Sequence, residues 1–282
     1  MRFISLRKDT SSSTTTTKRG KAMEALFAKR KRTYTIVFLS ITGLFILASH
    51  ITDYDPAAGL ISLPKAFIWI VTNLVPNEKS LQRLPNILDK LFETAFLSVA
   101  VTVTAAVCAF FFSLLGSKTT QINGILARIV RIVAAFFRNV PDVVWAILLL
   151  FSFGQNILTG FFALFFTTFG MLTRTFIETI DEVSADCVEA LHASGATYMQ
   201  TVFQGIVPSS ISEIITWILF MIETNIRSSA LIGILTATGI GYLFDLYYKR
   251  LDYPAASLVV LSIVVLVIIL EGISSKIRKV IM

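Results

Sequence analysis

Five charged side chains lie within or at the edges of strongly apolar runs of this sequence. They are Arg138, Arg174, Glu178, Glu223 and Arg227. A charge at the centre of a membrane-spanning helix costs roughly 2.5 to 3.5 kcal/mol, so these groups are expected to face protein or water. Guanidinium groups along a hydrophilic path would compensate the charge of a passing anion. Alternatively, these charges form structural ion pairs, because each glutamate lies four residues from an arginine, which is the spacing of an ion pair on one helix. For Arg174 we favour the pair.

Neutral polar residues and glycines extend this candidate path. Asn139 and Asn225 lie beside the charged positions and offer uncharged hydrogen bonds. The glycine- and threonine-rich run 236–241 predicts a broken or bent helix, which a membrane protein tolerates where backbone lines a cavity or is buried in protein. A plain glycine-rich turn is the alternative. The candidate path residues are Arg138, Asn139, Glu223, Asn225, Arg227, Thr238 and Gly239.

A polar island, residues 182–208, separates two apolar segments. Its acidic positions Glu182, Asp186 and Glu189 recur at helical spacing beside an apolar stripe, which predicts an amphipathic helix. A helix lying on a lipid surface usually carries Lys and Arg on its polar face, and residues 181–210 contain neither. The composition therefore favours docking into a basic groove on another protein over an ordinary hairpin on the lipid surface.

The rest of the island predicts a turn and a second helix. Gly195 interrupts the first helix, and Thr197 with Gln200 has the form of a capping box that starts a short second helix. We expect Pro208 to end that helix, and a further capping box at Ser210 to open the next apolar run.

Composition places the chain among polytopic membrane proteins. It is 55% hydrophobic and only 15% charged over 282 residues, with 23 Phe. Its two cysteines give no metal spacing and fall in different expected compartments. The only histidines, His50 and His192, are expected on opposite sides of the membrane, and no catalytic or phosphate-loop motif is present. An enzyme, a metal site and a nucleic-acid partner are therefore not indicated.

The chain begins with a basic tail, residues 1–33. Its low-complexity stretch from Ser11 to Thr17 is expected to be disordered, and Lys21 to Arg32 to form a basic interfacial helix. The apolar stretch from Ala66 to Val75 is ten residues long, whereas crossing about 30 Å of hydrocarbon takes about 20 residues. We therefore expect this stretch to lie in the membrane interface on the far side. Six spans are expected, at about 34–51, 91–115, 132–153, 157–180, 211–231 and 255–273.

The distribution of Lys and Arg predicts the orientation. The tail, residues 116–131, the island and the C-terminus together carry 16 Lys and Arg, against six in the two opposite loops. Because cytoplasmic loops carry the excess, both chain ends and the island are expected to be cytoplasmic.

The island also carries the residues of a known family motif. Glu189-Ala190-Leu191-His-Ala-Ser-Gly195, with Pro208 thirteen residues beyond the glycine, resembles the EAA loop by which bacterial ABC importer permeases dock their ATPase. Leu191 stands where that motif has its second alanine, and Gly205 and Val207 replace the Ile and Leu that usually precede the proline. The motif spacing is intact.

Four further segments are similar to the phosphonate-type branch of these permeases. They are Glu93-Thr94, the run from Arg138 to Ala146, Glu223-Thr-Asn-Ile-Arg227 and Thr238-Gly-Ile-Gly241. The resemblance implies a coupling loop at about 182–208 that includes Glu182, Asp186, Glu189, Ala190, Gly195 and Pro208. It further implies a second permease subunit that forms a homodimer with this one, two cytoplasmic ATPases that hold ATP and Mg²⁺, and an extracytoplasmic substrate-binding protein.

The expected fold is all-α: a type I ABC importer permease core of the MetI-like kind with one extra N-terminal span, about six in all. The expected parts are the tail 1–33, a first span with an interfacial segment at 34–90, and the permease domain at 91–282. The resemblance implies ATP-driven import of phosphonate or a related phosphorus oxyanion across the bacterial cytoplasmic membrane. A permease of the same architecture for another solute, such as an amino acid, is the alternative. An ion-coupled secondary transporter is less favoured, because no internal repeat is evident.

Overall fold

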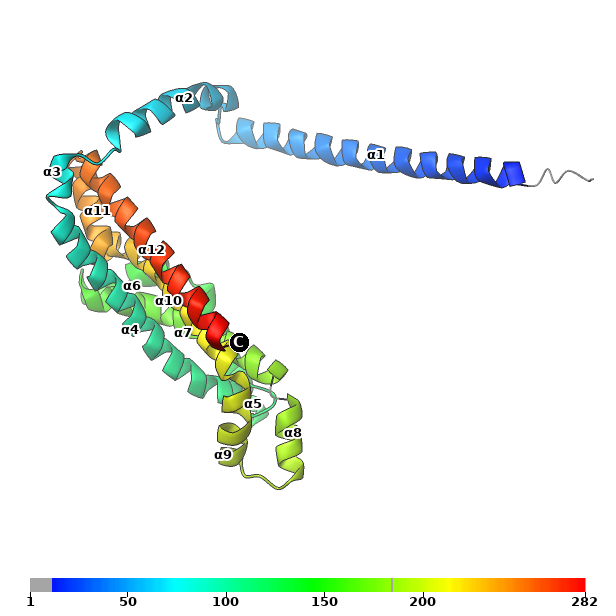
Figure 1. The fold of residues 1–282 in the computed structure, drawn as a ribbon, viewed down its shortest axis with the longest axis vertical. Coiled ribbons are helices and arrows are strands. Elements are labelled where there is room, and N and C mark those ends of the chain that lie inside the picture. The colour runs from blue at the N-terminus through cyan, green and yellow to red at the C-terminus, as the bar shows by residue number, and fades with distance from the viewer. Residues whose placement is uncertain (1–11, 184, 282) are drawn as a thin grey trace, which may run out of the picture. The chain divides into compact units, whose positions relative to one another are not determined.

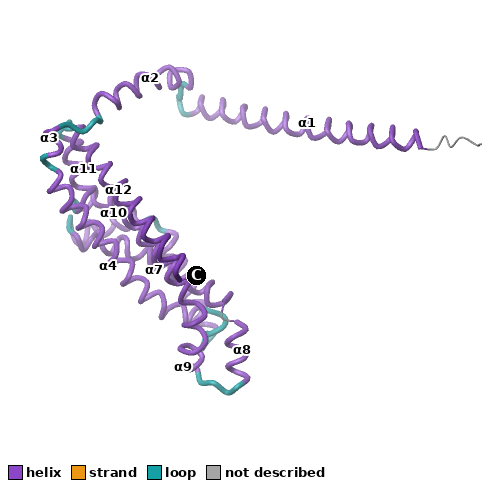
Figure 2. Tube along the Cα trace, in the orientation of Figure 1, coloured by secondary structure: helices purple, strands orange, loops and turns teal. Residues whose placement is uncertain are grey.

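The structure is a computed structural model that describes residues 12–183 and 185–281. Within these ranges all regular secondary structure is helical, as predicted (Figure 2). The chain divides into two units, Met1–Trp69 and Ile70–Met282. The helices are α1 (Ser12–Ile51), α2 (Pro56–Asn73), α3 (Glu78–Leu81), α4 (Leu84–Gly116), α5 (Gly124–Asn139), α6 (Asp142–Phe153), α7 (Ile157–Val183), α8 (Ala185–Ala193), α9 (Tyr198–Gln200), the π-helix η1 (Thr201–Ile206), α10 (Val207–Thr236), α11 (Gly239–Lys249) and α12 (Tyr253–Ile281).

The first unit is dominated by α1, whose stretch Lys29–Ile51 is long and apolar enough to cross a membrane. The helix already begins at Ser12, so the disorder expected from Ser11 to Thr17 is wrong for residues 12–17, and Ser11 lies outside the described residues. Starting a helix is unfavourable, whereas extending an existing one adds a hydrogen bond for each residue fixed. The apolar span is already helical, so the polar segment before it can continue the helix without a separate nucleation step.

The number of spans agrees with the prediction, but one of them is broken. Among the residues that the structure describes, five helices are long and apolar enough to cross a membrane, or six when the bent pair α5 and α6 counts as one span. The span expected at 132–153 is not one continuous helix, because α5 and α6 meet at an angle of 89°. Pro141 offers no backbone N–H and disfavours helical backbone in the residue before it, and Val140 is extended, with φ −92° and ψ 120°.

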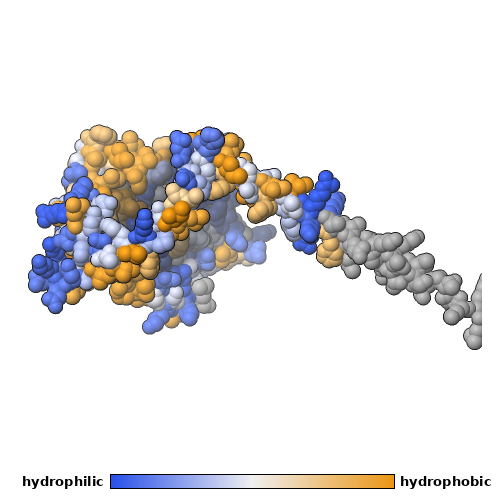
Figure 3. Space-filling model, turned by 90° about the horizontal axis from the view of Figure 1, so that it is seen from above, coloured by the Kyte–Doolittle hydropathy of each residue, from blue (hydrophilic) through white to orange (hydrophobic). Residues whose placement is uncertain are grey.

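The second unit is a bundle built around α7, which packs against α4, α5, α6 and α10 (Figure 1). Small residues on α4 allow this close packing: Ala105 and Ala109 are fully buried in one cluster with Phe176 of α7. The surface carries large hydrophobic areas between hydrophilic ones, as expected where helices face lipid (Figure 3).

Buried polar side chains tie the central helices together. The Asn225 amide nitrogen on α10 donates to Thr102 of α4 at 2.8 Å and to Thr168 of α7 at 3.0 Å. The hydroxyls of Ser98 and Ser229 are also hydrogen bonded, at 2.8 Å, between α4 and α10. These bonds satisfy polar groups that would otherwise be costly inside the bundle, and they fix the register of the three helices.

Candidate functional site

The polar island folds into a helical hairpin, as predicted for its first part. Gly195 closes α8 with a positive φ of 82°, and Ala196 N–H donates to the Leu191 carbonyl at 3.0 Å. Gly195 N–H donates to the His192 carbonyl at 3.0 Å, which completes a Schellman turn. Both bonds of the capping box that starts α9 are formed between Thr197 and Gln200.

The end of the hairpin differs from the prediction. Pro208 does not end a helix: it lies in the first turn of α10, where its missing N–H is tolerated. The chain reaches α10 through η1, and Val207 N–H donates to the Val202 carbonyl five residues earlier. The capping box expected at Ser210 is also wrong, because this buried hydroxyl donates to the Ile206 carbonyl at 2.6 Å.

Two of the three residues by which the island departs from the family motif, Leu191 and Gly205, lie against each other. A Cβ atom on Gly205 would be only 2.7 Å from Leu191 Cδ1 and 3.4 Å from Cys187 Sγ. The large side chain at position 191 therefore occupies the space left by the missing side chain at position 205. This exchange of volume keeps η1 packed on α8 and preserves the shape of the hairpin.

The acidic residues of the hairpin lie on its outer surface. Glu182, Asp186 and Glu189 are exposed, as are Ala190 and Pro208. In the part of the chain that the structure describes, none of the three carboxylates has an ion-pair partner within 4.0 Å. The stripe is therefore free to meet cations on another molecule.

The candidate arginines lie in two places. Arg138 and Asn139 are exposed at the end of α5, directly before the break to α6. Arg227 is 51% exposed on α10 and contacts the largely buried Glu223 at 3.4 Å. Glu223 also approaches Arg278 of α12 at 3.8 Å, a partner that the sequence did not reveal because it lies 55 residues away. The Glu223–Arg227 ion pair is thus present, and the Arg227 side chain remains half exposed on the surface of the subunit.

The remaining predicted path residues are packed between helices. Asn225 is 3% exposed, and its side chain bonds to two threonines as described above. Arg174 and Glu178 are instead exposed on α7, where they form the ion pair favoured from their spacing. The broken helix predicted at 236–241 is present: α10 ends at Thr236, Ala237 has a φ of 55°, and α11 begins at Gly239.

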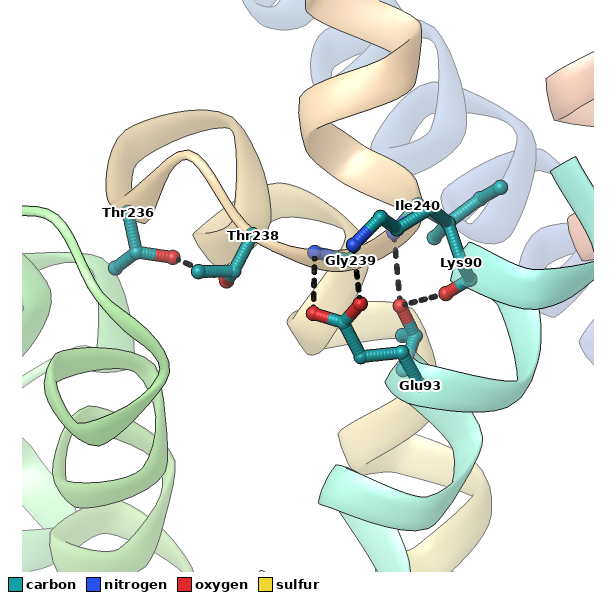
Figure 4. A network of polar contacts seen from close by, with 7 residues as sticks. Lys90, Glu93, Thr236, Thr238, Gly239 and Ile240 are labelled. Carbon is teal, nitrogen blue, oxygen red and sulfur yellow. Dashed lines mark hydrogen bonds and ion pairs between the residues drawn. The ribbon is translucent and has the colours of Figure 1, made fainter. Parts of the chain in front are cut away.

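Two residues of α4 hold this break (Figure 4). Gly239 N–H donates to Glu93 Oε1 at 3.2 Å, and Ile240 N–H donates to Thr94 Oγ1 at 2.9 Å. Lys90 pairs with Glu93 at 2.5 Å, and the hydroxyls of Thr236 and Thr238 are 2.8 Å apart. Glu93 and Thr94 thus cap α11 from another helix. The family resemblance singled out this pair, but nothing in the sequence indicated the cap.

The comparisons with known proteins identify the family. Residues 111–277 match the family described as binding-protein-dependent transport system inner membrane component. The chain belongs to this family. Its members are membrane components of importers, so the chain is a multi-pass transport permease of the inner membrane, and the phosphonate-type resemblance is confirmed.

Relatives of this permease have names that refer to phosphorus oxyanions. The chain is 28% identical to the phosphate-import permease protein PhnE of Mycolicibacterium smegmatis over 67% of its length, and the match spans only 36% of that relative. It is 26% identical to the phosphite transport system permease protein PtxC of Stutzerimonas stutzeri, over 67% of this chain and 69% of PtxC. A third relative, the putative phosphite permease HtxC of the same organism, is 25% identical over 90% of the chain and 89% of HtxC.

A solved structure shows the same fold. The inward-facing MetNI methionine ABC transporter matches 73% of this chain and 99% of the solved chain, with a TM-score of 0.59 at 20% identity. The predicted MetI-type architecture is thereby confirmed.

Proposed function

We propose that this permease is the membrane-spanning subunit of an ATP-driven importer for phosphonate or a related phosphorus oxyanion. The observation that carries the proposal is the accessible cation Arg138 beside the break between α5 and α6, in a chain whose relatives are named for phosphate and phosphite. Discontinuous helices are a common place for substrate sites in membrane transporters, because their backbone lines a cavity.

The arginine environments fit weak, reversible binding of an anion. Arg138 supplies an accessible positive charge, with Asn139 beside it as a neutral donor. Glu223 partly neutralises the positive charge of Arg227, and Glu223 is also approached by Arg278. The remaining positive field of Arg227 attracts an anion without holding it permanently. We assign Asn225, Thr238 and Gly239 a supporting role, in which they fix the helices around the path.

The helical hairpin of residues 182–208 is the coupling loop. Its exposed acidic stripe supports docking of a separate ATPase. We propose that two copies of the permease assemble with two such ATPases, which hold ATP and Mg²⁺, and receive substrate from an extracytoplasmic binding protein. Both chain ends and the coupling loop then face the cytoplasm, as the Lys and Arg distribution predicts.

The experiment is to purify the permease with its co-encoded partners and to measure ATP hydrolysis with the binding protein and a panel of solutes. Phosphonate, phosphite and phosphate are compared with methionine. We expect an ATPase to co-purify and a phosphorus oxyanion to stimulate hydrolysis. Stimulation by methionine alone, or purification without any ATPase, would contradict the proposal.

A further inference from the structure

Asp181 joins the stem of the coupling loop to the linker between α4 and α5. It lies in the last turn of α7, just before α8 begins at Ala185. Its Oδ1 atom accepts three hydrogen bonds: from Ser117 Oγ at 2.5 Å, from Thr119 N–H at 3.1 Å and from Thr119 Oγ1 at 3.1 Å. Hydrogen bonds to an ionised carboxylate are stronger than neutral ones, so this cluster, the Asp181 clamp, is a firm attachment.

The end of α4, next to this linker, is fastened to α5. Arg131 Nε of α5 donates to the Gly116 carbonyl at 2.8 Å. A Cβ atom on Gly116 would lie 2.6 Å from Ile177 Cδ1 and 3.0 Å from Val130 Cγ1, so α4, α5 and α7 meet here without free space. A movement at the end of α7 is therefore passed to the middle of α5.

A second attachment holds the C-terminal end of α5 on α7. Gly170 precedes Asp181 by eleven residues, about three helical turns, so both lie on one face of α7. A Cβ atom on Gly170 would lie 2.6 Å from the Arg138 backbone nitrogen and 2.8 Å from the Ala134 carbonyl oxygen. Phe137 stacks on Phe166 nearby, with ring centroids 5.0 Å apart. The backbone of Arg138 thus rests directly on α7.

We propose that Asp181 is a positioning residue that makes α5 and the second half of α7 move as one body with the coupling loop. A displacement of α8 then shifts Arg138 without a change in the packing between α5 and α7. The inference rests on the proposed function, because it assumes that the coupling loop receives force from an ATPase. It adds the route by which that force reaches the anion path.

The test is the number of substrate molecules imported per ATP hydrolysed by the complete complex in proteoliposomes. Asp181→Leu removes all three hydrogen bonds and is expected to lower this ratio about tenfold, within the usual range of coupling between sites, while hydrolysis and ATPase association persist. Asp181→Asn keeps one oxygen acceptor at the same place and is expected to retain most of the coupling. Glu271→Gln, at an exposed position on α12, is the control and should leave the ratio unchanged.

A double variant keeps the proposal testable if the Asp181→Leu permease fails to assemble with its partners. If Asp181→Leu does not assemble, Ser117→Ala with Thr119→Val removes the two hydroxyl donors from the other side of the clamp and should lower the ratio in the same way. An unchanged ratio in the assembled variants, or an equal loss in Asp181→Asn, would overturn the role of Asp181 while leaving the importer assignment in place. Absence of ATP-driven uptake by the parent complex would overturn both.

Discussion

Leu191 and Gly205 show how one contact preserves the coupling loop at the scale of single residues. Each departs from the family motif, and from sequence alone the two changes are unrelated. In the structure the leucine side chain fills the place where a side chain at position 205 would lie. The pair therefore keeps the packed volume of the hairpin constant, although both residue types differ from the usual pattern.

This packing predicts non-additive variants. Gly205→Ile alone should overpack against Leu191, and Leu191→Ala alone should leave a cavity, each costing about 1 to 3 kcal/mol. The double variant should recover part of that loss, since the new isoleucine fills the space left by the leucine. Thermal unfolding of the purified complex and the amount of co-purified ATPase measure the effect. Leu261→Ala, at an exposed position on α12, is the control, and strictly additive losses would contradict the compensating contact.

Long-range partners are what sequence reasoning missed at this scale. The Glu223–Arg227 and Arg174–Glu178 pairs follow from a spacing of four residues, and both are formed. Arg278 and the Asp181 clamp instead join residues 55 or more positions apart, whose proximity depends on how the helices pack. No local pattern encodes such a distance.

At the scale of elements, the two helix breaks differ in how well the sequence signals them. The break at Thr236 to Gly239 follows from the local glycines and threonines, because glycine adopts positive φ without strain. The break at Pro141 lies between apolar residues on both sides, so hydrophobicity joins α5 and α6 into one expected span. The π-helix before Pro208 was missed because its residues carry no signal distinct from those of an ordinary helix.

The break before α11 predicts the effect of a single methyl group. Gly239 has a φ of 59°, and an added Cβ atom would overlap Thr94 Oγ1. Gly239→Ala should therefore cost about 1 to 2 kcal/mol from backbone strain alone and lower the unfolding temperature. Gly272→Ala on α12 is the matched control, because its added Cβ atom meets nothing within 4 Å. Equal unfolding temperatures for the two variants would show that the break tolerates a side chain.

At the scale of the whole molecule, composition and charge predicted the fold class and the number of spans. Hydrophobic runs locate helices reliably in a membrane protein, because every backbone group in the lipid must be satisfied internally. Hydrophobicity alone did not reveal the break inside the third expected span. The proline rule placed the end of the island helix at Pro208, whereas the helical segment continues from Tyr198 to Thr236. Both errors concern connections between helices, which depend on packing rather than on hydrophobicity.

The orientation of the molecule is tested with its two cysteines. Cys187 is exposed on α8, and Cys108 is half-buried in α4. In a Cys108→Ala background, a maleimide that cannot cross membranes should label Cys187 in inside-out vesicles and not in right-side-out vesicles. Labelling only in right-side-out vesicles would place the coupling loop on the wrong side for an ATPase.

The central claim, a path for a phosphorus oxyanion through this subunit, is tested most directly by ATP-dependent uptake of radiolabelled phosphonate, phosphite or phosphate into proteoliposomes with the complete complex. We expect uptake by the parent and a loss of about tenfold or more, or about 1.4 kcal/mol, in Arg138→Gln and in Arg227→Gln. Arg174→Gln also removes an arginine from a pair spaced four residues apart and should retain uptake. Parent-level uptake by both path variants, at matched membrane levels and ATPase association, would contradict the account.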